Sequence, residues 1–98
     1  MTTPNAAIEL QGTVGAGVVI ELAAYPGAGA VWSAPVPPPG CRIEDAGRVA
    51  ADAAVGGPVT QRFRFSADSP GRYALQFELK RPWEAVVRAQ QPVLIDIR

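Results

Sequence analysis

Apolar and polar side chains alternate along much of the second half of the chain. Every second residue between Arg72 and Lys80 is apolar: Tyr73, Leu75, Phe77 and Leu79. A period of two places these side chains on one face of an extended segment, which predicts a half-buried β-strand. Phe63 and Phe65 alternate with arginines just upstream, and residues 67–71 contain the turn-forming pair Pro-Gly. We therefore expect the two strands to pair as a hairpin.

Shorter apolar runs predict the remaining strands, at residues 8–10, 18–22, 31–33, 41–45, 85–89 and 93–97. In the closing strand, Val93, Ile95 and Ile97 are expected to point inward. Residues 46–54 are rich in alanine and would allow one helical turn, but the surrounding pattern favours strand and loop. Residues 90–92 are expected to form a turn, and the proline-rich residues 35–40 a stiff crossover.

These strands predict an all-β fold, because no convincing amphipathic helix exists anywhere in the sequence. Seven to eight short strands separated by turn signals are typical of an antiparallel, immunoglobulin-like β-sandwich. A chain of 98 residues is long enough for one core. We expect residues 8–98 to form this domain, with Trp32 filling its centre, and residues 1–7 to form a flexible N-terminus.

Composition narrows the possible functions. Nine basic and nine acidic residues cancel without a dense basic run, so we expect no nucleic-acid partner. The chain contains no histidine, which removes Ser/His/Asp triads, Cys/His dyads and histidine-ligated metals. Cys41 lacks a disulfide partner and is interpreted as a small strand-end residue. The carboxylates are scattered, so we expect no catalytic residue, metal or cofactor, and an enzyme is the least favoured class.

The stretch between Leu22 and Cys41 carries no charge, but its five prolines exclude a membrane helix. We therefore expect no membrane partner. No secretory leader is visible, because a basic start is missing and Glu9 and Glu21 interrupt the apolar runs. The compartment stays open: cytoplasmic if Met1 is the native start, periplasmic or secreted if a leader has been removed.

Three segments, at residues 25–31, 55–58 and 81–83, break the strand pattern with residues that contribute little to a core. A sandwich places its connections at its two ends, and three connections at one end would form a binding edge. On spacing alone the simpler interpretation is favoured, in which Trp83 belongs to the core and the glycines only form turns.

The same three segments resemble the motifs of the chagasin family of cysteine peptidase inhibitors. That family's pattern is Asn-Pro-Thr-Thr-Gly-Tyr-x-Trp, then Gly-x-Gly-Gly, then Arg-Pro-Trp or Arg-Pro-Phe. The corresponding stretches here are Tyr25-Pro26-Gly27-Ala28-Gly29-Ala30-Val31-Trp32, Val55-Gly56-Gly57 ahead of Phe63-Arg64-Phe65, Pro70-Gly71, and Arg81-Pro82-Trp83-Glu84. Each motif alone is weak, but three in register over nearly the whole chain are strong.

The resemblance implies a monomeric, reversible inhibitor of papain-like cysteine peptidases that is not cleaved. The first segment would sit over the catalytic cysteine, and the other two would hold the walls of the cleft. Small residues at Gly27 and Ala28 suit close backbone approach, and Trp83 would be the aromatic anchor. The residues implied to contact the peptidase are Tyr25, Pro26, Gly27, Ala28, Gly29, Val55, Gly56, Gly57, Arg81, Pro82 and Trp83.

The first segment departs from the family pattern. Tyr25 replaces asparagine, Gly27 and Ala28 replace both threonines, Ala30 replaces tyrosine, and Ala54 stands at the second motif's first glycine. Two lost hydroxyls forfeit two possible hydrogen bonds of ~0.5–1.5 kcal/mol each, or ~10- to 100-fold in affinity. We therefore expect a weaker inhibitor or another peptidase preference. The alternative is an immunoglobulin-like interaction module that has lost inhibition and uses the same edge for a different partner.

Overall fold

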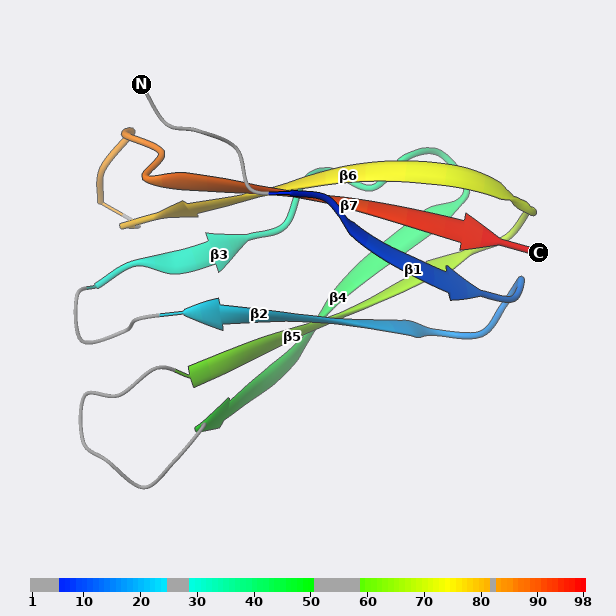
Figure 1. Cartoon of the computed structure of the whole chain (residues 1–98), viewed down its shortest axis with the longest axis horizontal. Helices are drawn as coiled ribbons and strands as arrows, with labels where there is room; N and C mark the ends of the chain where they lie inside the picture. Colours follow the sequence, from blue (N-terminus) through cyan, green and yellow to red (C-terminus); the bar gives the residue numbers. More distant parts are fainter. Residues whose placement is uncertain (1–5, 25–28, 51–58, 82) are drawn as a thin grey trace.

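The computed structural model describes residues 6–24, 29–50, 59–81 and 83–98, and their regular structure consists of β-strands (Figure 1). The strands are β1 (Ile8–Gly12), β2 (Val18–Ala24), β3 (Val31–Ser33), β4 (Cys41–Ala50), β5 (Val59–Ala67), β6 (Gly71–Lys80) and β7 (Ala89–Ile97). The predicted all-β class is confirmed. Within the described residues no helix has the length and apolar character needed to cross a membrane.

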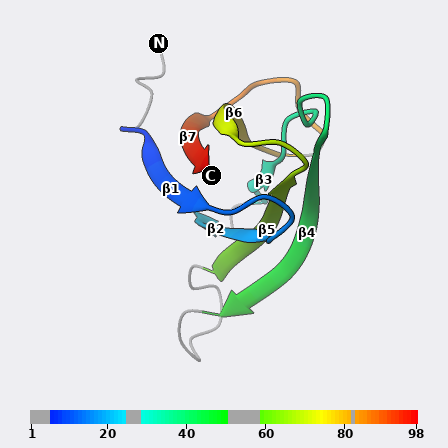
Figure 2. The same cartoon turned by 90° about the vertical axis from the view of Figure 1, so that its right-hand side faces the viewer.

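Two sheets face each other, which confirms the predicted β-sandwich. The four-stranded sheet has the order β1-β7-β6-β3 and the three-stranded sheet the order β2-β5-β4. Figure 2, turned by 90°, shows β7 and β6 in one layer and β2 and β5 in the other. The pairs are antiparallel except β1 with β7, which run parallel from Ile8 opposite Val93 to Gly12 opposite Ile97.

The predicted hairpin between the two phenylalanine-bearing strands is wrong, because β5 and β6 lie in different sheets. Both strands point their apolar rows into the same interior, but from opposite sides. The rings of Phe63 and Phe77 meet there with centroids 5.0 Å apart and planes tilted by 49°. A period of two identifies the buried face of each strand, but it does not say whether two successive strands pair or face each other.

The connection between these strands is fixed by a tyrosine near the start of β6. The Tyr73 hydroxyl donates a hydrogen bond of 2.7 Å to the carbonyl oxygen of Ser69. This tyrosine-to-backbone bond is typical of the corner where the chain passes between the sheets of an immunoglobulin-like sandwich. The turn predicted at residues 67–71 is therefore a crossing between layers.

The core lies between the sheets and consists of the inward rows of β2, β5, β6 and β7. Its largest fully buried side chains are Phe65, Phe77, Ile20, Ile95, Ile97 and Val93. The inward direction predicted for the closing strand is confirmed, and so is the burial of Trp32, which is 8% exposed. Burial of this apolar surface is the main source of stability for the scaffold.

Two predictions near the C-terminus are wrong. Residues 85–89 were expected to form a strand and residues 90–92 a turn, but strand β7 begins at Ala89 and runs through Pro92. Pro92 lies opposite Gln76 of β6, just before the parallel pairing with β1 begins at Val93. At that position β7 has a strand on only one side, so the missing N–H of proline is tolerated.

The other described segments agree with the predictions from the sequence. Cys41 begins β4, as expected for a strand-end residue, and residues 34–40 cross from one sheet to the other, as expected for the proline-rich connector. Strand β4 continues to Ala50, with a register shift between Asp45 and Arg48. Residues 1–5 and 51–54, for which a flexible end and a loop were expected, lie outside the described residues.

Candidate functional site

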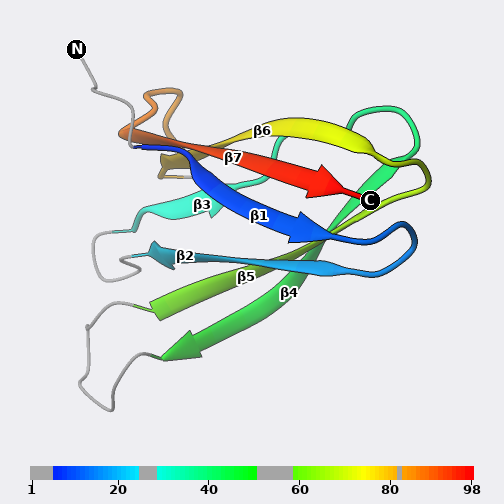
Figure 3. The same ribbon diagram turned by 45° about the vertical axis from the view of Figure 1, so that its right-hand side comes forward.

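The strand ends that flank the three unusual segments all lie at one end of the sandwich. Ala24 at the end of β2 and Ala50 at the end of β4 are both paired with Val59 at the start of β5. In the other sheet, Val31 at the start of β3 is paired with Lys80 at the end of β6. Figures 1 and 3 show these ends together, on the left of both views. We call this end the loop edge, and the described residues 29–31, 81 and 83–88 form part of it.

The base of the first segment is fixed by Trp32. Its indole Nε1 donates a hydrogen bond of 2.7 Å to the carbonyl oxygen of Ala23, which joins the two strands that flank residues 25–30. The buried side chain of Gln61, in the opposite sheet, holds the backbone of Trp32. Its Oε1 accepts from the Trp32 N–H at 2.7 Å, and its Nε2 donates to the Trp32 carbonyl at 3.3 Å. Both sheets therefore anchor the point where the first segment ends.

Gly29 and Trp83 bring the first and third segments into direct contact. A Cβ atom added to Gly29 would lie 2.8 Å from the outermost ring carbon of the Trp83 indole and 3.8 Å from the Cγ of Arg81. The backbone of Gly29 has φ +79°, a region that favours glycine. Trp83 nevertheless remains 71% exposed. One edge of the ring thus rests on the glycine, while most of it faces solvent.

A tight turn carries the tryptophan. The Glu84 N–H donates to the Arg81 carbonyl at 3.0 Å, which closes a turn at Trp83. The carboxylate of Glu84 also meets two guanidinium groups, that of Arg81 at 3.3 Å through Oε1 and that of Arg88 at 3.3 Å through Oε2. The Arg88 N–H returns to the Leu79 carbonyl at 2.7 Å, where the ladder with β7 begins.

Most of the sequence matches a known protein family. Residues 12–97 match the family described as Chagasin family peptidase inhibitor I42. The chain belongs to the chagasin family. The resemblance carried by the three motifs is thereby confirmed.

Two solved structures share the fold of this chagasin-family chain. The cysteine protease inhibitor EhICP2 from Entamoeba histolytica has a TM-score of 0.67 and 17% sequence identity, covering 94% of this chain and 88% of that one. PbICP-C, solved in complex with falcipain-2, has a TM-score of 0.62 and 15% identity, covering 100% and 96%. A comparison with curated proteins gives no match.

Three of the residues implied by the chagasin motifs, Gly29, Arg81 and Trp83, lie in the described part of the chain and close together. The exposure of Trp83 contradicts the simpler interpretation, in which this side chain belongs to the core. The other implied residues lie outside the described residues: Tyr25, Pro26, Gly27, Ala28, Val55, Gly56, Gly57 and Pro82. For those, the contact with a peptidase stays a prediction.

Sequence reasoning missed four residues of the loop edge or its support. Glu84 and Arg88 form the ion pairs beside Trp83, Val86 is 66% exposed on the same segment, and Gln61 holds Trp32. Val86 and Arg88 were hidden by the strand expected at residues 85–89, whereas Glu84 was quoted with the third motif but given no role. For Gln61 a signal was present, because its amide stands in the inward row with Phe63 and Phe65, where a polar side chain needs a partner.

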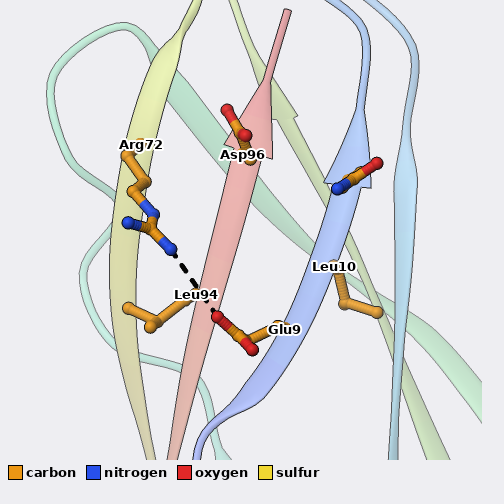
Figure 4. Close-up of a pocket in the computed structure, with 6 residues that line it drawn as sticks. Glu9, Leu10, Arg72, Leu94 and Asp96 are labelled. Carbon is orange, nitrogen blue, oxygen red and sulfur yellow. Dashed lines mark ion pairs between the residues drawn. The ribbon is translucent and has the colours of Figure 1, made fainter.

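A shallow depression of about 240 Å³ lies elsewhere, on the outer face of the four-stranded sheet (Figure 4). It is lined by Glu9, Leu10, Gln11, Arg72, Leu94 and Asp96. Its arginine, Arg72, pairs with Glu9 at 3.6 Å, and both side chains are about 70% exposed. The depression is thus a solvated surface whose charges partly satisfy each other.

Cys41 lies at the end opposite the loop edge, where β4 begins beside the end of β5. Burial raises the pKa of its thiol above the ordinary 9.0, the Tyr73 hydroxyl opposes this shift, and the charge of Asp68 adds to it. A raised pKa keeps the thiol protonated and weakly nucleophilic near neutral pH. Among the described residues, no group of three His, Cys, Asp or Glu side chains could hold a metal ion.

Proposed function

We propose that this chain is a reversible inhibitor of papain-like cysteine peptidases, which uses the loop edge to occlude the active-site cleft. The observation that carries the proposal is the solvent-facing indole of Trp83 resting on Gly29 in a member of a peptidase inhibitor family. The related folds of EhICP2, a cysteine protease inhibitor, and of PbICP-C, solved with falcipain-2, support the choice of peptidase class.

The inhibitor would act by shape, with no catalytic step of its own. Gly29 has no side chain and its neighbours Ala28 and Ala30 carry only methyl groups, so the backbone here would approach the cleft closely. Trp83 would fill a site on the cleft wall, because tryptophan is a residue type that often dominates binding energy. Arg81 would stack on an aromatic ring or meet an acidic rim.

The remaining motif residues belong to the same proposal. Residues 25–28 would cover the catalytic cysteine of the peptidase, residues 55–57 would hold the second wall, and Pro82 would fix the direction between its two neighbours. Because the first segment lacks both motif threonines, we expect affinity ~10- to 100-fold below that of a full motif. A chagasin-like binding module that has lost inhibition is the second candidate, favoured by this altered segment.

A titration separates the two candidates. Papain and a cathepsin L-type peptidase would each be incubated with increasing protein, and the residual hydrolysis of a fluorogenic peptide measured at several substrate concentrations. A competitive pattern is expected. If hydrolysis continues at the same rate at high micromolar protein, the inhibitory function is wrong and the module remains.

A pair of variants tests the anchor. Trp83→Ala is expected to raise the inhibition constant about 30-fold or more, since truncation of such an anchor costs at least about 2 kcal/mol. Val36→Ala serves as the matched control, because Val36 is 91% exposed and lies in the crossover between β3 and β4. An unchanged inhibition constant for Trp83→Ala would remove this residue as the anchor.

A further inference from the structure

Glu84 stands between two arginines that belong to the two ends of one segment. Its Oε1 lies 3.3 Å from the Arg81 Nη1 and its Oε2 lies 3.3 Å from the Arg88 Nη2. The three side chains are 30% to 43% exposed, so water screens the pairs only in part. Arg81 follows the last residue of β6 and Arg88 precedes the first residue of β7. One carboxylate therefore closes the whole connection between these strands.

We propose that Glu84 is a positioning residue of the loop edge, whose carboxylate holds Arg81 and residues 83–88 in the shape that rests the Trp83 indole on Gly29. The consequence for affinity depends on the peptidase inhibition proposed above. The consequence for the order of the segment does not, because it concerns the free protein alone.

The segment needs such a device because core packing does not hold the tryptophan in place. Residues 83–88 form no strand, and the Trp83 side chain is 71% exposed, so core packing does not fix it. The contact of the ring with Gly29 covers only one edge. Segments with few buried contacts open at low free-energy cost, and a modest electrostatic term is then enough to shift their conformational equilibrium.

The position of Glu84 next to the tryptophan makes this effect specific. Its backbone N–H closes the turn on the Arg81 carbonyl at 3.0 Å, while its side chain reaches Arg88 on the returning part of the segment. Without the charge, the two arginines would repel each other at the same site. We therefore expect loss of the carboxylate charge to loosen the whole segment rather than to remove one contact.

Order in the free protein matters for binding because an anchor that is already placed does not have to be immobilised on contact. Each exposed ion pair contributes little binding energy by itself. We therefore expect Glu84→Gln to raise the inhibition constant roughly three- to tenfold. The substitution keeps the size of the side chain, removes its charge and replaces one of its two acceptor oxygens by a donor.

The test uses Glu84→Gln, Arg88→Gln, the double variant and a control, Glu21→Gln. Glu21 is matched because it also forms an ion pair of 3.3 Å, with Arg62, but on the outer face of the other sheet. The first readout is the heteronuclear NOE of the two indole N–H groups in the free, ¹⁵N-labelled protein. The indole of Trp32 is buried and hydrogen-bonded to Ala23, so it serves as the rigid internal reference.

We expect Glu84→Gln and Arg88→Gln to lower the NOE of the Trp83 indole, with the Trp32 value unchanged. The double variant should be no more mobile than Glu84→Gln alone, because both substitutions break the same pair. Glu21→Gln should match the unsubstituted protein. A Trp83 indole equally ordered in Glu84→Gln and in the unsubstituted protein would overturn the positioning role.

The second readout is the inhibition constant of the same four variants. A rise for Glu84→Gln together with a mobile indole supports the proposal. A rise with an ordered indole overturns it, since Glu84 would then act by direct contact with the peptidase. If the unsubstituted protein does not inhibit, the proposed function fails, and the NOE measurement still decides the role of Glu84.

Discussion

The indole of Trp83 rests on the backbone of Gly29, so closely that a single added carbon on the glycine would lie 2.8 Å from the ring. The two residues belong to different connections and are 54 positions apart in the chain (83 minus 29). A side chain at position 29 would therefore displace the Trp83 ring. The first and third segments share one surface at this point, so a change at Gly29 affects Trp83.

Gly29→Ala is expected to weaken inhibition through Trp83. The new methyl group would displace the indole, and φ +79° adds backbone strain of about 1 kcal/mol. Gly40→Ala is the matched control, because Gly40 has φ +76° with nothing within 4 Å of its added carbon. Urea denaturation should show a similar loss of stability for both variants, whereas only Gly29→Ala should raise the inhibition constant. Equal inhibition by the two variants would contradict the coupling.

Gln61→Leu is expected to destabilise the protein by about 2–3 kcal/mol. The substitution removes both partners of the Trp32 backbone, and a buried N–H and carbonyl without partners carry the full cost of desolvation. Gln76→Leu, on the exposed side of β6, is the control and should change the free energy of unfolding by less than about 0.5 kcal/mol. The measurement is urea denaturation followed by circular dichroism. Similar midpoints for the two variants would show that the Gln61 amide does little.

The two tryptophans should respond differently to a quencher in water. Trp83 is 71% exposed and Trp32 is 8% exposed, so iodide is expected to quench mainly Trp83. A catalytically inactivated papain-like peptidase is then added, and its own fluorescence is subtracted. If Trp83 enters the peptidase cleft, iodide should quench Trp83 less in the complex than in the free protein. The Trp83→Phe variant provides the control and should show little quenching in either state. Unprotected Trp83 in a formed complex would place the contact elsewhere.

Stability is expected to fall as pH rises above about 9. Burial raises the pKa of the Cys41 thiol from 9.0 and that of the Tyr73 hydroxyl from 10.0, with neighbouring Cys41 and Asp68 contributing to the latter. The folded state therefore holds its protons more strongly than the unfolded state. This contribution is complete below the unfolded pKa values and is lost as pH rises through the folded ones.

Urea denaturation between pH 7 and pH 11 would measure this loss. Cys41→Ala removes one of the two titrations and should flatten the decline in unfolding free energy around pH 9 to 10. Asp96→Asn, which alters a carboxylate on the outer face of the other sheet, should leave the decline unchanged. A steeper decline for Cys41→Ala than for the unsubstituted protein would mean that the sign is wrong.

The sequence predicted the strands better than their partners. Alternation placed Tyr73, Leu75 and Phe77 correctly, because the buried face of a strand is a local property with a period of two. Pairing is not local: the crossing at residues 67–71 looks like a hairpin turn until the opposite sheet is known. The parallel pair of β1 and β7 likewise joins the two ends of the chain, and no spacing within either strand reveals it.

The proximity of Gly29, Arg81 and Trp83 could be predicted from the sequence, because the motifs that contain them are short and contiguous. Residues that support them from a distance could not be predicted in this way. Glu84 directly follows Trp83 in the sequence, but its role depends on its ion pair with Arg88, which was predicted to lie in a strand. Gln61 acts across the sandwich on Trp32, and such a contact appears only when both sheets are in place.

The first segment leaves one sheet at Ala24 and enters the other at Val31, whereas the second and third segments each start and finish in a single sheet. The gap between the sheets therefore sets the distance between the two strand ends that the first segment connects. Side chains that fill this gap, such as Leu22 and Leu79, thus influence the spacing of the strand ends at the loop edge. Selection for a narrower or broader peptidase cleft would then act on the interior of the molecule as well as on its tips.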